Sequence, residues 1–180
     1  GLVGGYVLGI EVSRRLSGPG AGQGGAPAEL TQADKAAGEF VSVTLADTEE
    51  VWAKVFDEQV GQPYNPAILV LYKGVTQSAC GGASGATGPF YCPGDKKVYL
   101  DTEFFSTLEE RLGAAGDFAS AYVVAHEIGH HVQDELSILG KANQVRAQMS
   151  ESESNAISVR IELQADCFSG IWAREAAQKF

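Results

Sequence analysis

The sequence predicts an α+β domain, and three observations indicate this class. Two segments, near 118–136 and 150–172, repeat apolar residues at helical spacing. A third helical pattern runs from about Asp34 to Val60 and stops before Gly61. Apolar, partly β-branched runs at 68–72 and 97–100 are typical of strands. A helix, then strands, then further helices is the order of an α+β fold with a small sheet.

The composition is that of one globular domain preceded by an apolar segment rich in Gly and Pro. The chain of 180 residues, 44% hydrophobic and 20% charged, can bury one substantial core. We expect residues 1–30 to form an apolar and Gly/Pro-rich arm and linker, and residues 31–180 to form the domain. The net charge of −10 argues against a nucleic-acid partner, because neutralising phosphates requires clustered Lys and Arg.

The first helix is expected to contribute to the core, and a shorter one to follow the strands. Trp52 and Phe56 lie on the predicted helix of 34–60 and are interpreted as core packing. A short helix is expected over 102–112, after the strand of 97–100.

The helix expected over 118–136 has one apolar stripe. Asp117 is a suitable N-cap for it, and Gly129 in its middle costs about 1 kcal/mol relative to Ala. We expect the close approach of another segment to compensate for that cost. The stripe follows the i, i+4, i+7, i+11 rhythm and consists of Phe118, Tyr122, Ala125, Gly129, Val132 and Leu136.

Every histidine of the chain lies between positions 126 and 131 of this helix. The run H-E-I-G-H at 126–130 has the H-E-x-x-H pattern. Residues four apart lie on the same helix face, so His126 and His130 can bind one zinc ion. Glu127 is then placed to act as a general base. His131 is expected not to bind the metal, and either to contact Glu127 or to be exposed at the cleft rim.

A zinc site of this kind needs a third protein ligand. Glu162 and Asp166 lie four apart on the last helix, beside an apolar stripe that ends at Trp172. We interpret Glu162 as the third zinc ligand, and Asp166 as the acceptor of the second N–H of a zinc-bound imidazole. The alternative is that both acids are solvated on an outer face. A capping box of Ser150 and Glu153 marks the start of this helix.

These motifs carry a resemblance to known proteins. H-E-I-G-H-H-V-Q at 126–133 followed by E-L-Q-A-D at 162–166 is similar to the gluzincin arrangement. The residues within these motifs are more similar still to those of a bacterial family of neutral zinc metallopeptidases. Supporting stretches include S-A-C-G at 78–81, G-P-F-Y-C-P-G-D at 88–95 and L-Q-A-D-C-F-S-G at 163–170.

The resemblance implies a zincin-like, minimal gluzincin fold with an active-site helix and a glutamate helix. It implies an exported or membrane-tethered bacterial zinc protease with one Zn²⁺, and the membrane segment would precede or include residues 1–10. Because members of the family continue well past the glutamate helix, the domain is expected to be cut short at its C-terminus.

Zincin-like enzymes bind an extended peptide along a strand edge above the metal. By this resemblance, Val98, Tyr99 and Leu100 are the expected substrate-binding strand. The alternative is that these residues only complete the sheet.

The cysteines bear on the compartment in which the protein acts. Cys80 and Cys92 bracket a Gly-rich segment, and a disulfide would stabilise it by about 3 kcal/mol. We favour that disulfide over two free thiols, and it points to an oxidising, extracytoplasmic location. Cys167 is left over and is interpreted as a small buried hydrophobe.

The expected function is hydrolysis of peptide bonds in a peptide or protein substrate, by water activated on zinc with Glu127 as base. Two other readings remain open at this point. One is a metal-bound scaffold domain of a membrane complex, and the other is a zinc amidase acting on cell-wall peptides.

Overall fold

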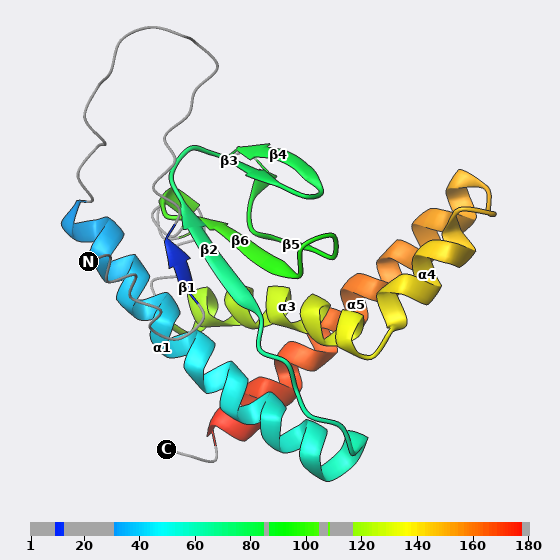
Figure 1. Cartoon of the computed structure of the whole chain (residues 1–180), viewed down its shortest axis with the longest axis horizontal. Helices are drawn as coiled ribbons and strands as arrows, with labels where there is room; N and C mark the ends of the chain where they lie inside the picture. Colours follow the sequence, from blue (N-terminus) through cyan, green and yellow to red (C-terminus); the bar gives the residue numbers. More distant parts are fainter. Residues whose placement is uncertain (1–9, 13–30, 85–86, 105–107, 109–116, 178–180) are drawn as a thin grey trace, which may run out of the picture.

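The computed structural model describes residues 10–12, 31–84, 87–104, 108 and 117–177 (Figure 1). The elements in chain order are β1 (Ile10–Val12), α1 (Gln32–Val55), the π-helical turn η1 (Phe56–Val60), β2 (Ile68–Tyr72), β3 (Val75–Ser78), β4 (Gly81–Ser84), β5 (Phe90–Cys92), β6 (Lys97–Asp101), α3 (Asp117–Glu135), α4 (Ile138–Arg146) and α5 (Glu151–Ala177). The predicted α+β class is therefore observed.

Four strands form one sheet in the order β1-β2-β6-β5 (Figure 1). β1, β2 and β6 run parallel, whereas β5 runs antiparallel to β6. β3 and β4 pair with each other as a separate antiparallel hairpin. Strands β2 and β6 match the predicted runs. β1 was not expected: Ile10–Val12, in the segment interpreted as an arm, pair with β2.

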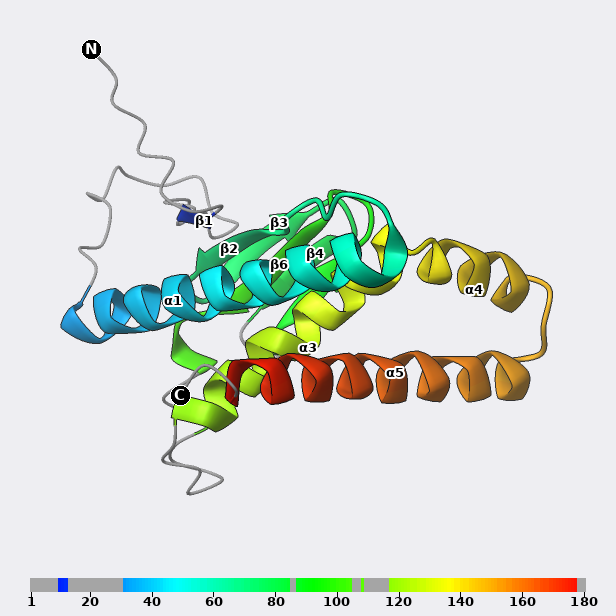
Figure 2. The same ribbon diagram turned by 90° about the horizontal axis from the view of Figure 1, so that it is seen from below.

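The helices cover one face of this sheet. α3 lies between the sheet and α5, and α1 packs beside α3 (Figure 2). The core between them combines buried residues of α1, η1, β2, β6 and α3, which are Val41, Leu45, Trp52, Phe56, Leu69, Leu71, Val98, Leu100, Val124, Ile128 and Val132. Residues of the opposite sheet face, Val70, Tyr72, Cys92 and Tyr99, form a smaller cluster with Phe90.

Both ends of α1 have a local cause. At its start, the Thr31 hydroxyl accepts a hydrogen bond from the Asp34 N–H, and the Asp34 carboxylate accepts one from the Thr31 N–H. At the other end, the helical turn η1 stops at Gly61, whose φ of 72° lies in the left-handed region that glycine adopts easily. Trp52 and Phe56 are 3% and 2% exposed, which confirms their assignment to the core.

The helix that carries the histidines, α3, was predicted within a residue or two, but its buried face is broader than the predicted stripe. Ala125, Gly129 and Val132 are buried as expected. Phe118, at the first turn, is instead 63% exposed, and its ring stacks beside Trp172 of α5. The fully buried Val124 and Ile128, outside the predicted stripe, face the sheet.

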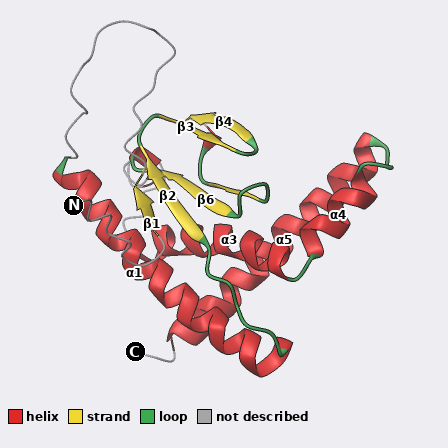
Figure 3. Ribbon diagram, viewed as in Figure 1, coloured by secondary structure: helices red, strands yellow, loops and turns green. Residues whose placement is uncertain are grey.

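Helix α5 crosses α3 at Gly129, where a larger residue would crowd the backbone of α5. A Cβ atom on Gly129 would lie 3.0 Å from the carbonyl oxygen of Ala165 and 3.2 Å from its Cα. The expected close approach at Gly129 is therefore confirmed. The Ser150–Glu153 capping box at the start of α5 is also present. Helix α4 was not expected, and with the first part of α5 it projects away from the sheet (Figures 1 and 3).

Two predicted segments lie largely outside the residues that the structure describes. The short helix expected over 102–112 falls largely on residues 105–107 and 109–112, which are outside the described residues. The same holds for residues 1–9 of the expected membrane segment. Among the described residues, no helix combines the length and apolar character required to cross a membrane.

Candidate metal centre

The histidine pair is placed by α3, whose unbroken helical course brings positions four apart onto one face. The rings of His126 and His130 lie edge to face, with centroids 4.8 Å apart. Their side chains are 20% and 13% exposed, so both remain partly accessible to solvent. Glu127 lies between them in sequence and is buried.

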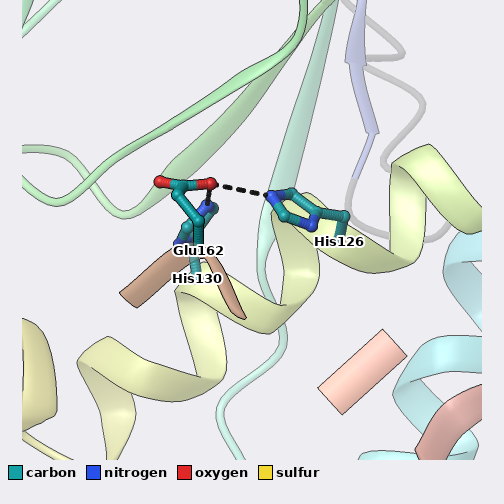
Figure 4. A group of neighbouring side chains, drawn as sticks. All are labelled: His126, His130 and Glu162. Atoms are coloured by element: carbon teal, nitrogen blue, oxygen red, sulfur yellow. Dashed lines mark hydrogen bonds and ion pairs between the residues drawn. The ribbon is translucent and has the colours of Figure 1, made fainter. Parts of the chain in front are cut away.

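Glu162 reaches the same point from α5 (Figure 4). Its Oε2 atom lies 3.2 Å from His126 Nε2 and 3.4 Å from His130 Nε2. One ligand atom from each of the three residues falls within 4.8 Å of the other two. Two helices far apart in sequence therefore bring two nitrogens and one oxygen together, as predicted for His126, His130 and Glu162.

The donor set and its spacing fit a zinc ion. Zinc binds imidazole nitrogen and carboxylate oxygen at about 2.0–2.2 Å, so tetrahedral ligand atoms stand about 3.3 Å apart. The two Nε2–Oε2 distances of 3.2 and 3.4 Å match that separation. A site of two histidines and one glutamate leaves the fourth position free for water or substrate, as in catalytic zinc sites.

The other nitrogen of each imidazole is occupied by a protein acceptor. His126 Nδ1 lies 2.9 Å from Asp166 Oδ1, which is the contact predicted for Asp166. His130 Nδ1 lies 2.9 Å from Gln133 Oε1. With Nδ1–H donating in both rings, both Nε2 lone pairs face a carboxylate oxygen, an arrangement that a cation between them would stabilise.

Gln133 was missed as a site residue. A signal existed, because Gln133 follows His130 by three positions and shares its helix face. A glutamine at a position that the structure buries completely needs polar partners, and one of them is His130.

Glu127 is placed in a protected environment beside the donor set. It is 7% exposed, and burial raises the pKa of its carboxyl above the ordinary value. The neighbouring imidazoles of His130 and His126 oppose that rise, as does a hydrogen bond from the Tyr91 backbone N–H. A carboxylate with a raised pKa is a stronger proton acceptor near neutral pH than an ordinary glutamate.

His131 occupies a different environment from the one expected. It is 1% exposed and does not line a cleft rim, and the partners found for it are not Glu127. Its Nε2 donates to the Asn65 carbonyl at 2.7 Å, and Nδ1 lies 3.3 Å from the Tyr91 hydroxyl. Burial lowers the pKa of the His131 imidazole. The prediction of a local role was therefore wrong, because α3 turns this side chain towards β5 and the loop at Asn65.

The strand of Val98, Tyr99 and Leu100 has no free edge. β6 pairs with β2 on one side and with β5 on the other. Val98 and Leu100 are 0% exposed in the core, and Tyr99 stacks on Phe90 across the opposite face. These residues complete the sheet, so the prediction that they form the substrate-binding edge was wrong. Periodicity identifies a strand but not its neighbours, and the edge on this side of the described sheet belongs to β5.

The predicted disulfide between Cys80 and Cys92 is present, and it ties the β3–β4 hairpin to β5. Cys92 is 0% exposed. Cys167 is a free thiol, but it is exposed, so its interpretation as a buried residue was wrong. It directly follows Asp166 on α5.

A comparison with known protein families also points to zinc. Residues 2–180 match the model of the family described as "Putative neutral zinc metallopeptidase". The chain belongs to this family, and the resemblance noted from its motifs is thereby confirmed.

Relatives come from several bacteria. The uncharacterized protein YpfJ of Escherichia coli K12 is 42% identical over 99% of this chain and 61% of its own length. The uncharacterized protein Rv2575 of Mycobacterium tuberculosis is 49% identical over 63% of this chain and 38% of its own length. The chain thus spans about three fifths of YpfJ. No solved structure matches the chain.

Proposed function

We propose that this protein is a zinc-dependent peptidase of a small zincin-like fold, which cleaves peptide bonds within peptide or protein substrates. The observation that carries the proposal is the convergence of His126, His130 and Glu162 on one point, beside the buried carboxylate of Glu127. Zinc bound there would supply a Lewis acid that polarises the scissile carbonyl and makes water acidic near neutral pH.

The side chains of the protein supply the remaining chemistry. Glu127 would accept the proton of the attacking water and deliver it to the departing amine. A purely structural metal site does not require a general base, so the presence of Glu127 favours catalysis over a scaffold role. Asp166 would hold His126 in the orientation that directs Nε2 towards the metal.

A peptide substrate is proposed to lie along β5. Tyr91 donates its backbone N–H to Glu127, so the N–H and C=O of this residue point away from β6 and towards the metal side. Pro89 and Pro93 flank β5 on either side, and proline has no N–H to donate. This edge would therefore accept hydrogen bonds from a substrate backbone at Tyr91 without donating in return.

We further propose that the peptidase acts outside the cytoplasm. The Cys80–Cys92 disulfide supports this location, because disulfides persist in oxidising compartments and are rare in the cytosol. Because Cys92 is the last residue of β5, the disulfide would also hold this edge strand in place in an oxidising compartment.

The decisive comparison is between the wild type and Glu127→Gln, with zinc content and cleavage of an unfolded protein measured on both. Loss of a general base is expected to lower the cleavage rate by about 10²–10⁴-fold, while zinc content stays unchanged because Glu127 is not a ligand. Equal cleavage by the two zinc-loaded proteins would favour a scaffold. Cleavage confined to cell-wall peptides would favour an amidase.

A further inference from the structure

Gln133 is the least expected polar residue near the metal centre. Its side chain is 0% exposed, between α3 and α5. The amide oxygen Oε1 lies 2.9 Å from His130 Nδ1. The amide nitrogen donates to the Ile161 carbonyl at 2.8 Å and to Gln164 Oε1 at 3.0 Å. Both amide hydrogens and the oxygen of Gln133 are thus hydrogen-bonded to protein atoms, as its complete burial requires.

These contacts determine which way the amide points. If the amide were flipped, its oxygen would face the Ile161 carbonyl, and two acceptors would meet without a proton between them. The oxygen must therefore face His130, and His130 Nδ1 must carry a proton to donate to it. The neutral imidazole then has its lone pair on Nε2, the atom that faces Glu162.

The same side chain also fixes the position of α5. Ile161 immediately precedes Glu162, and Gln164 follows it by two residues. Gln133 thus bonds to α5 on either side of the third ligand, at the level of the metal centre. If Gln133 only joined the two helices, it would not need to contact the His130 imidazole as well.

We propose that Gln133 is a positioning residue of the metal centre: it holds His130 in the tautomer with Nε2 free, and it sets the place of Glu162 against the histidine pair. The proposal rests on the function proposed above. Asp166 does for His126, through an exposed carboxylate, what Gln133 does for His130 through a buried neutral amide. A neutral partner avoids burying a second charge close to Glu127.

The test measures metal affinity in four proteins: wild type, Gln133→Met, Gln133→Glu and Gln164→Met. Zn²⁺ affinity is obtained by competition with a chromophoric chelator, and the Co²⁺-loaded forms report ligand geometry through their visible absorption. Met keeps the length of Gln133 but removes its polar atoms, so Zn²⁺ affinity is expected to fall by about 10–100-fold and the Co²⁺ spectrum to change. Circular dichroism of the metal-free proteins confirms that each variant is folded.

The other two variants separate positioning from simple packing. Gln133→Glu keeps an acceptor oxygen for His130 but turns a second acceptor towards the Ile161 carbonyl, so its Zn²⁺ affinity should lie between those of Gln133→Met and the wild type. Gln164→Met leaves the His130 and Ile161 contacts in place, and its affinity should remain within about threefold of wild type. A folded Gln133→Met with wild-type affinity and spectrum would overturn the proposal, as would equal losses in Gln133→Met and Gln164→Met. Failure of the wild type to bind Zn²⁺ would instead overturn the proposed function.

Discussion

The two imidazoles of the metal centre are held by partners of different charge and exposure. Asp166 is a carboxylate whose side chain is 50% exposed, and it accepts from His126. A carboxylate partner makes the imidazole a stronger donor to a metal and fixes its orientation. Since half of the Asp166 side chain is in contact with solvent, replacing it should leave the fold intact.

Asp166→Asn is therefore expected to weaken zinc binding by about 10–100-fold, with little change in unfolding. Chelator competition gives the affinity, and urea unfolding of the metal-free protein gives the stability. The matched control is Glu151→Gln, which neutralises another exposed acid of α5 about 16 Å along the helix from Glu162. An equal effect of both replacements would mean that Asp166 acts only through net charge.

At the scale of single elements, the crossing of α3 and α5 determines where Glu162 lies. The backbones of the two helices lie close together at Gly129 and Ala165, within one turn of all three proposed ligands. A methyl group on Gly129 would meet the backbone of Ala165, which cannot turn aside as a flexible side chain could. The helices would then separate by a few tenths of an ångström or more.

Gly129→Ala is expected to lower zinc affinity measurably while the free energy of unfolding changes little. The gain of about 1 kcal/mol in helix propensity offsets part of the packing loss, but it cannot restore the ligand positions. Gly140→Ala in α4 is the control, because a Cβ there meets nothing within 4 Å. That control should gain up to about 1 kcal/mol with unchanged zinc affinity. Unchanged zinc binding in Gly129→Ala would show that the crossing does not control the site.

The start of α1 gives the fold a defined dependence on acid. Hydrogen bonds from Thr31 hold the pKa of Asp34 far below its ordinary value of 3.8, assisted by Lys73 and opposed by burial. Since the pKa is lower in the folded state than in the unfolded one, the carboxylate stabilises the fold above the unfolded value. That contribution is lost progressively as the pH falls below 3.8 towards the folded value.

Asp34→Asn should lower the free energy of unfolding by about 1 kcal/mol at neutral pH, the usual cost of losing such a cap. Urea unfolding of both proteins between neutral pH and about pH 2.5 should show the difference shrinking below 3.8. A difference that stays constant over the whole range would contradict the role of the charge.

Across the molecule, the sequence predicted the features that are determined within one segment of the chain. The course of α1, α3 and α5 follows from apolar periodicity, and the H-E-x-x-H spacing fixes two ligands within one helix. Glu162 and Asp166 could be inferred because acids four apart share one helix face, although their side chains prove to be 59% and 50% exposed and so are not forced by burial to find partners.

Features that depend on contacts between distant segments were missed. β1, β3, β4 and β5 have three or four residues each, with little apolar alternation, and pairing alone defines them. The place of β5 at the sheet edge, and hence the error over Val98–Leu100, could not be read from periodicity. His131 and Gln133 are equally non-local, since their partners belong to the Asn65 loop and to α5.

Zinc titration of the wild type and Glu162→Gln shows whether α3 and α5 together hold one zinc ion. The wild type should bind one Zn²⁺ per chain. Glu162→Gln should lose more affinity than the 10–100-fold or so that the loss of an outer partner causes. Wild-type zinc affinity in a folded Glu162→Gln protein would mean that α5 supplies no ligand.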